Sequence, residues 1–359
     1  MTCPGPRHKT VSPRARQAEK PREDLLRLYQ AAVVFRDLAP WEWMDDDRVF
    51  GVEDSGAGPA VYCSILGGLE TVFGLAAYVG ADGFASYLRI ATGESEPDDF
   101  DAGISQDCLL VTFEPRSGLM DRDRREAAEL GMTFRGRNAW PLFRSSRPGY
   151  APWYLEPAEL RLLAAALEQA VDVCTRIRDG VPLVPQALDR PLLMRHRDEA
   201  NGEWRDAWVV PPVPPAPAVA PRPPHTRIER LLRTARRATA TTETALVYLP
   251  SMVAERGQRP YFPRVWFEAD HKTGIIGMSD LLEPHRTPAE AQEAFLVALD
   301  QTRVLPAEIR TASDASFALL APVAEALAIP LRRVRSTPAL DAARHALEAA
   351  FSRRGAGAF

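Results

Sequence analysis

The segment Pro211–Pro224 has the sequence PPVPPAPAVAPRPP, and it limits what the whole chain can fold into. Proline has no backbone N–H donor and a fixed φ, so this run favours an extended polyproline II conformation and excludes a packed helix or an interior strand. We therefore predict a proline-rich linker at residues 211–225, with separately folded domains at 21–210 and 226–355. A docking site for a proline-recognising domain is a second interpretation, but a linker needs no partner to explain it.

The length of the chain agrees with this division, because 359 residues are more often two domains than one. Residues 1–20 are polar and lack hydrophobic periodicity, which predicts a disordered tail. No apolar stretch approaches the roughly 20 residues of a membrane-spanning helix, and the N-terminus lacks the apolar core of a secretory signal. These features predict a cytoplasmic protein that does not enter the membrane.

The four cysteines, Cys3, Cys63, Cys108 and Cys174, lie far apart and form no C-x-x-C pair. This spacing argues against a zinc ribbon and against a thioredoxin-like site. Cys63 and Cys108 lie in strand-like runs, and Cys174 lies on the apolar face of a predicted helix. We therefore expect buried, reduced thiols.

The formal charge of −4 is unevenly distributed along the chain. From His225 onward 18 Lys/Arg stand against 15 Asp/Glu, a charge of +3, which leaves 26 against 33, or −7, for the preceding residues. Neither part is basic enough to indicate nucleic-acid binding, although the charge of the C-terminal domain does not exclude it.

Hydrophobic periodicity assigns elements to the N-terminal half. Residues 22–38 have helical spacing, and 157–177 show a clearer helical pattern with a proline in the first turn. The β-rich runs 48–53 and 61–66 flank a glycine- and proline-containing turn, which predicts a hairpin. A second hairpin is predicted around Asn201-Gly202, and its strands would pack with the helices as a mixed α/β domain.

The C-terminal half has a different order of elements. A helix at 226–237 precedes three strands, and the capping box Thr287-Pro288-Ala289-Glu290 then opens an alternation of helices and strands that ends in a helix at 338–351. An antiparallel beginning followed by β-α-β crossovers predicts a mixed sheet with flanking helices. The fold class is therefore α/β and α+β, with two mixed α/β domains.

Several short motifs resemble two uncharacterised bacterial domain families that often occur together. The motifs of the first family are Trp41-Glu42-Trp43, Val49-Phe50-Gly51-Val52, Tyr62-Cys63-Ser64 and Phe73-Gly74-Leu75-Ala76-Ala77-Tyr78-Val79-Gly80. The motifs of the second family are Arg259-Pro260-Tyr261-Phe262-Pro263, Asp270-His271-Lys272-Thr273-Gly274 and Leu305-Pro306-Ala307-Glu308-Ile309. The resemblance covers roughly residues 22–355. It implies a bacterial protein with two modules, and it implies no activity.

Aromatic and acidic residues gather near the N-terminal hairpin. Trp41 and Trp43 precede the run Asp45-Asp46-Asp47, a combination of ring faces and carboxylates that could line a pocket for a cationic or sugar-like ligand. Trp41, Trp43, Asp45 and Asp46 are therefore candidate ligand-binding residues. The alternative is that the indole rings cover the core while the acids face water.

Three acids of the C-terminal domain are candidate catalytic residues. Asp270 ends a strand, Asp314 follows another, and Glu348 lies on the last helix, an order similar in outline to ribonuclease H-like nucleases, whose acids bind Mg²⁺ or Mn²⁺ at a scissile phosphate. Each acid also has a simpler interpretation. Asp270 suits a turn, Asp314 suits a helix N-cap, and Glu348 could pair with Arg344.

The sequence lacks the P-loop, the dinucleotide-binding fingerprint, H-E-x-x-H and G-x-S-x-G. We therefore expect a non-catalytic binding or adaptor protein. The alternative is a metal-dependent, phosphodiester-cleaving enzyme that uses Mg²⁺ or Mn²⁺ in its C-terminal domain. Neither alternative names a ligand or a partner.

Overall fold

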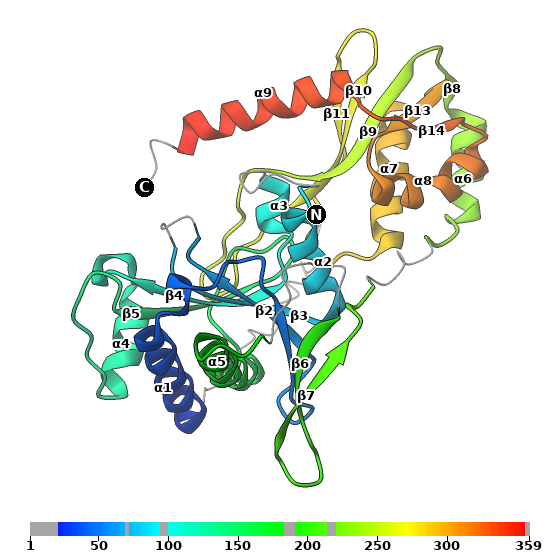
Figure 1. Ribbon diagram of the computed structural model, residues 1–359. Coiled ribbons are helices and arrows are strands. Elements are labelled where there is room, and N and C mark those ends of the chain that lie inside the picture. The colour runs from blue at the N-terminus through cyan, green and yellow to red at the C-terminus, as the bar shows by residue number, and fades with distance from the viewer. Residues whose placement is uncertain (1–20, 69–71, 94–99, 183–190, 214–219, 356–359) are drawn as a thin grey trace, which may run out of the picture. The chain divides into compact units, whose positions relative to one another are not determined.

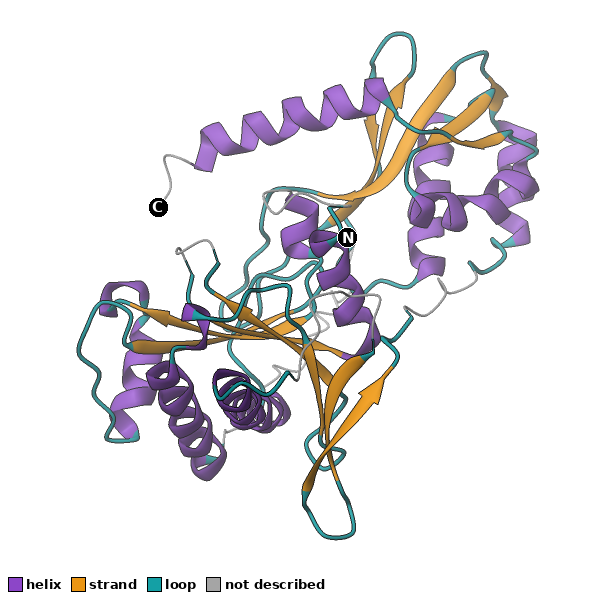
Figure 2. Ribbon diagram, in the orientation of Figure 1, coloured by secondary structure: helices purple, strands orange, loops and turns teal. Residues whose placement is uncertain are grey.

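The computed structural model describes residues 21–68, 72–93, 100–182, 191–213 and 220–355. The predicted tail at 1–20 and the centre of the predicted linker, 214–219, lie outside these ranges. The fold is mixed α/β, with one large sheet in each half of the chain, as the periodicity predicted (Figure 2). Among the described residues, no helix has both the length and the apolar composition that crossing a membrane requires.

The N-terminal half forms a seven-stranded sheet in the order β5-β4-β3-β2-β1-β6-β7. Its strands are β1 (Phe50–Glu53), β2 (Val61–Leu66), β3 (Gly74–Val79), β4 (Cys108–Glu114), β5 (Trp140–Ser146), β6 (Leu192–Arg197) and β7 (Trp204–Val209). Strand β1 pairs antiparallel with β2 and parallel with β6, and β6 pairs antiparallel with β7. Both predicted hairpins are therefore present.

Two long helices pack against each other beside this sheet (Figure 1). They are α1 (Arg22–Leu38) and α5 (Pro157–Arg178), and the shorter helical elements of this half are η1 (Pro40–Glu42), α2 (Gly80–Ala91), α3 (Phe100–Ile104), η2 (Arg116–Gly118) and α4 (Asp121–Glu129). Leu160, Leu163 and Leu167 of α5 are fully buried, which fits the core-facing stripe of an amphipathic helix. The free cysteines Cys63 and Cys174 are buried in the same half.

The compact units of the chain are not contiguous in sequence. The first unit comprises Met1–Ala77, Leu109–Phe143 and Tyr154–Val209, and the second comprises Tyr78–Cys108, Arg144–Trp153 and Val210–Phe359. The candidate site described below lies entirely between residues 241 and 341, within the second unit.

The C-terminal half forms a five-stranded mixed sheet in the order β11-β10-β9-β13-β14. Its strands are β9 (Thr241–Tyr248), β10 (Arg264–Asp270), β11 (Ile276–Met278), β13 (Glu308–Thr311) and β14 (Leu331–Arg333), and a small separate pair joins β8 (Arg236–Arg237) to β12 (Val304–Leu305). Strands β11, β10 and β9 are antiparallel neighbours, whereas β9, β13 and β14 run parallel. The predicted antiparallel beginning and parallel end are both confirmed.

Helices pack on both faces of this sheet (Figure 1). They are α6 (His225–Thr234), α7 (Pro288–Thr302), α8 (Asp314–Leu327) and α9 (Pro338–Gly355). Residues of α6, α7 and α8 form one apolar core with Trp266 and Ile309, and Leu340 and Ala343 of α9 form another with Val265 and Phe267 on the opposite face. Helix α9 packs mainly on β9 and β10. On the same face of the sheet, the polar side chains of β13 and β14 are therefore not covered by α9 and are partly exposed.

Candidate functional site

The site begins with a carboxylate buried in the sheet. Glu243 of β9 lies on the α9 face, in a strand that is otherwise rich in threonine and apolar residues, and only 1% of the residue is exposed. One carboxylate oxygen accepts a hydrogen bond from the backbone N–H of Leu340, in the first turn of α9, at 3.0 Å. A strand side chain therefore satisfies an N–H group that a helix cannot pair internally, and its negative charge is favourable beside the positive end of the helix dipole.

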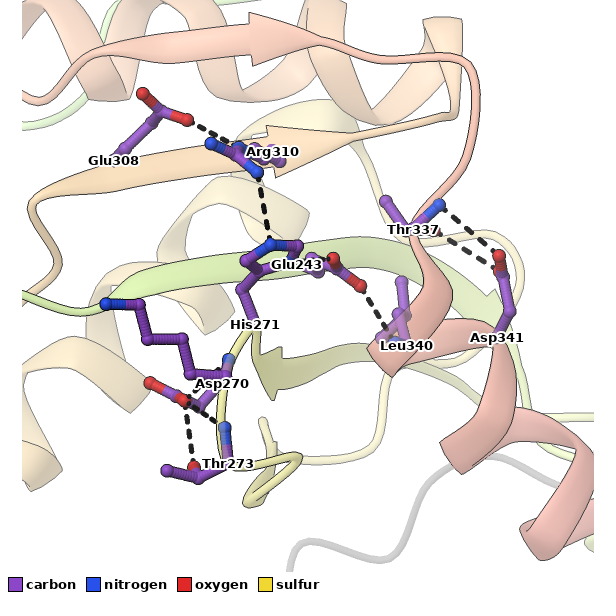
Figure 3. Close-up of polar contacts among 10 residues, drawn as sticks. Glu243, Asp270, His271, Thr273, Glu308, Arg310, Thr337, Leu340 and Asp341 are labelled. Atoms are coloured by element: carbon purple, nitrogen blue, oxygen red, sulfur yellow. Dashed lines mark hydrogen bonds and ion pairs between the residues drawn. The ribbon is translucent and has the colours of Figure 1, made fainter.

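The second partner of Glu243 is a histidine. Nδ1 of His271 lies 2.5 Å from the other carboxylate oxygen of Glu243, and Nε2 lies 3.4 Å from Nη1 of Arg310 (Figure 3). A neutral imidazole that carries its proton on Nδ1 suits both contacts, because Nδ1–H then donates to the carboxylate and Nε2 accepts from the guanidinium. Glu243 thereby fixes the ring and directs Nε2 toward the side of β13.

Glu308 positions two guanidinium groups on the same face. Register places Arg310 of β13 opposite Glu243 and beside Arg332 of β14. Nε of Arg310 donates to Glu308 at 2.5 Å, and Nε of Arg332 lies 3.1 Å from the second oxygen of the same carboxylate. Among the described residues, Arg310 Nη2 has no hydrogen-bond partner, and Glu308 is the only carboxylate that pairs with Arg332.

We call His271, Glu308, Arg310 and Arg332 the open-face cluster. Its side chains are partly to largely exposed, from 16% for Glu308 to 67% for Arg332. The carboxylates of Glu308 and of Glu243 behind His271 balance the two arginines in charge, but terminal guanidinium N–H groups match the oxygens of a carboxylate or a phosphate. Such an arrangement can bind an anion from solvent.

The three acids predicted as a catalytic set have different surroundings. Asp270 ends β10 beside Thr242, the residue that pairs with Ile309 near the beginning of β13. Asp314 begins α8, after the opposite end of β13, so these two acids lie toward opposite ends of the strands. Glu348 lies on α9, and its side chain is outside the described part of the structure. Among the described residues, no group of three acidic, histidine or cysteine side chains could hold a metal ion.

Asp270 instead stabilises the β10–β11 turn. Its Oδ1 accepts hydrogen bonds from the backbone N–H groups of Lys272 and Thr273 and from the Thr273 hydroxyl (Figure 3). These hydrogen bonds lower the pKa of Asp270, and those from Thr273 have the largest effect. The simpler interpretation of this acid as a turn former describes its contacts well.

Asp314 is not the N-cap of α8, contrary to its simpler interpretation. Ser313 is the N-cap, and its hydroxyl accepts the backbone N–H of Ser316. Asp314 occupies the first helical position and pairs with Arg333 at 2.6 Å, and the hydrogen bond from Arg333 lowers its pKa. A serine and an aspartate in succession both suit a helix start, so sequence alone does not choose between them.

The substitution Ser313→Ala should therefore lower the free energy of unfolding by about 1 kcal/mol through loss of the cap. The matched change Asp314→Asn should have a clearly smaller effect, because its ion pair with Arg333 is exposed to solvent. Urea denaturation of both variants measures the two values. A larger loss from Asp314→Asn than from Ser313→Ala would reassign the cap.

The residues predicted as a ligand pocket near the N-terminal hairpin divide between core and surface. The Trp41 ring packs against the rings of Phe35, Phe73 and Phe113, with centroids 5.5–6.0 Å away. Trp43 is half-buried, and the Arg178 guanidinium lies 6.0 Å from its ring centroid. Asp45 and Asp46 are exposed. Both indole rings are therefore half-buried, Trp41 against an aromatic cluster and Trp43 beside Arg178, whereas the two acids are exposed.

Sequence reasoning did not identify Glu243, His271, Glu308, Arg310 or Arg332 as a set. Glu243 was the one residue whose sequence position could have indicated this site. An acid inside an otherwise apolar and threonine-rich strand needs polar partners when it is buried. Its partners lie in a turn, in a parallel strand and in the last helix, so their proximity depends on the complete topology.

The arrangement defines a two-module mixed α/β protein with a polar cluster on its C-terminal sheet. Residues 26–195 match the family model described as Domain of unknown function (DUF7309), and residues 227–348 match the one described as Domain of unknown function (DUF6930). The expected combination of two uncharacterised domain modules is thereby confirmed. No curated protein and no solved structure matches the chain.

Proposed function

We propose that this protein is a non-catalytic, cytoplasmic binding or adaptor protein of a bacterium, and that its C-terminal module holds an anionic group of its ligand on the open-face cluster. One observation carries the proposal. Glu308 binds Arg310 and Arg332 through their Nε atoms, so both guanidinium groups are oriented while terminal N–H groups remain available.

The electrostatics of the cluster support an anion as ligand. His271 Nε2 lies 3.4 Å from Arg310 Nη1, which leaves Nη2 of Arg310 available to an anion. Lys272, exposed in the adjoining turn, adds another positive charge. Because the cluster lies at the surface, binding should weaken as salt concentration rises.

Inorganic pyrophosphate is a suitable probe, with binding measured by calorimetry on the full chain at low salt. Arg310→Gln should weaken binding about tenfold or more, since hydrogen bonds to charged groups contribute about 1.5–3 kcal/mol each. Arg256→Gln, at an exposed arginine outside the cluster, is the matched control and should bind as wild type does. Equal affinity in the two variants would remove the support for this site.

The alternative function, metal-dependent phosphodiester cleavage, draws less support from the contacts. Asp270 is engaged in its turn, and Asp314 lies beyond the other end of β13. A labelled single-stranded oligonucleotide incubated with Mn²⁺ tests this alternative in the same samples. Cleavage that disappears in both Asp270→Asn and Asp314→Asn would favour the enzyme over the binding protein.

A further inference from the structure

The two edges of the C-terminal sheet differ in chemistry. The edge strand β14 carries Arg332 and Arg333 within its three residues, and charged side chains on an edge discourage pairing with another chain. The opposite edge strand, β11, has the sequence Ile276-Gly277-Met278 without a charge. The charged edge strand β14 is therefore protected against pairing with another chain, whereas the edge strand β11 lacks this protection.

The outer edge of β11 offers free backbone groups. Hydrogen bonds from Asp270 N to Ile275 O and from Ser279 N to Trp266 O fix the alternation of the β10–β11 pairing. In this alternation the backbone N–H and C=O groups of Gly277 point toward β10. The backbone N–H and C=O groups of Ile276 and Met278 therefore point outward, toward the open edge of the sheet. No other described strand pairs with β11.

Apolar side chains accompany this free edge. Ile276 is 50% exposed and Met278 is 52% exposed, and both lie on the α9 face of the sheet, in register with Ala269 and Phe267. Ile275 and Leu281, on either side of β11, are also largely exposed. Residues 275–281 therefore expose four large apolar side chains, two of which, Ile276 and Met278, lie on the same face of the sheet.

We propose that β11 pairs antiparallel with β11 of a second copy of this chain, about a two-fold axis that passes at Gly277. In this register Ile276 of one copy lies opposite Met278 of the other, so the outward N–H and C=O groups of both strands are satisfied and the apolar side chains pack together. The two Gly277 residues face each other on the opposite side of the sheet, where neither has a side chain that could crowd the axis.

The charges that flank β11 favour a second copy as the occupant. Antiparallel pairing places the turn of one copy, which carries Lys272, beside the end of the strand in the other copy, which carries Asp280. Both side chains are exposed. Opposite charges therefore meet twice across the two-fold axis, while the two Asp280 residues lie at opposite ends of the interface. An isologous interface of this kind closes on itself as a dimer.

Sedimentation equilibrium of the full chain over a wide concentration range tests the dimer. Wild type should show a reversible monomer–dimer equilibrium, and Met278→Lys should weaken dimerisation by at least about tenfold. Met252→Lys, at another half-exposed methionine, is the control and should associate as wild type does. Asp280→Lys should weaken the dimer, and the double variant Lys272→Asp/Asp280→Lys should restore it.

A cysteine at the axis tests the register. Gly277→Cys, in a Cys3→Ser background, should form a disulfide-linked dimer under mild oxidation. Opposed residues of a non-hydrogen-bonded antiparallel pair have Cα atoms about 4.5 Å apart, within disulfide reach. A β-carbon at Gly277 would meet Glu268 only at ordinary contact distance, 3.7 Å, so the substitution should fold.

Ile275→Cys is the matched control for the crosslink, because its Cα would lie about 14 Å from its symmetry mate along the strands. It should remain monomeric on a denaturing gel. A chain that is monomeric at every concentration, or equal crosslinking at positions 275 and 277, would overturn the proposal.

Discussion

Replacing Glu243 with alanine should lower the free energy of unfolding by about 2–4 kcal/mol, because each buried donor that loses its acceptor costs about 1–3 kcal/mol. The side chain is buried, and its two oxygens satisfy the Leu340 N–H and the His271 ring. Both donors would lose their acceptor together. The first turn of α9 would also lose its favourable charge. Chemical denaturation of the full chain measures the change.

Two further variants separate the contributions of Glu243. Glu243→Gln keeps one carbonyl acceptor and should cost only about 1–2 kcal/mol. Glu325→Ala, at an exposed acid of α8, should change stability by less than about 0.5 kcal/mol. A double-mutant cycle between Glu243 and His271 then isolates the coupling of this pair. A loss from Glu243→Ala no larger than that from Glu325→Ala would show that the buried carboxylate does not support α9.

The parts of the fold that could be predicted from the sequence are those fixed by local pattern. Helical spacing in residues 157–177, the Asn201-Gly202 hairpin and the capping box at Thr287 each act within a few residues, and the structure has all three. Strand β5 was not predicted. Its burial alternates, but its sequence WPLFRSS contains proline, arginine and two serines, so the apolar alternation is weak.

The open-face cluster could not be predicted in the same way. Glu243, His271, Arg310 and Arg332 lie on separate segments, and each alone is an ordinary polar residue. Their proximity results from the order β10-β9-β13-β14, in which a parallel crossover places β13 beside β9. Asp270 and Asp314 were candidate catalytic residues because each lies at the end of a strand, yet they lie toward opposite ends of the sheet. The sequence shows that a residue ends a strand, but it does not show at which end of the sheet that strand ends.

Glu268 should make the protein more stable in mildly acidic than in mildly alkaline solution. It lies on β10, on the face opposite Glu243, and its Oε1 is buried without a hydrogen-bond partner among the described residues. Burial raises the pKa of this carboxyl from 4.5 to about 7. A difference of this size corresponds to about 3 kcal/mol between the protonated and ionised forms.

The direction of the effect follows from where the proton is held. Below the pKa of the unfolded chain both states are protonated, and Glu268 adds no penalty. As pH rises toward the folded-state pKa, the unfolded state releases its proton first, so the folded state loses stability. Above that value the penalty is complete, because a carboxylate whose Oε1 is buried without a partner among the described residues must then be ionised.

Glu268→Gln removes the ionisation while keeping the size of the side chain. It should therefore raise the free energy of unfolding by up to about 3 kcal/mol near pH 8 and change it little near pH 5. Urea denaturation at both pH values, with Glu325→Gln as the exposed control, gives the comparison. The decisive quantity is the difference between variant and wild type as a function of pH, since other carboxylates titrate equally in both proteins. A difference that stays constant from acidic to alkaline pH would mean that Glu268 has an ordinary pKa and that solvent reaches its carboxylate in the folded chain.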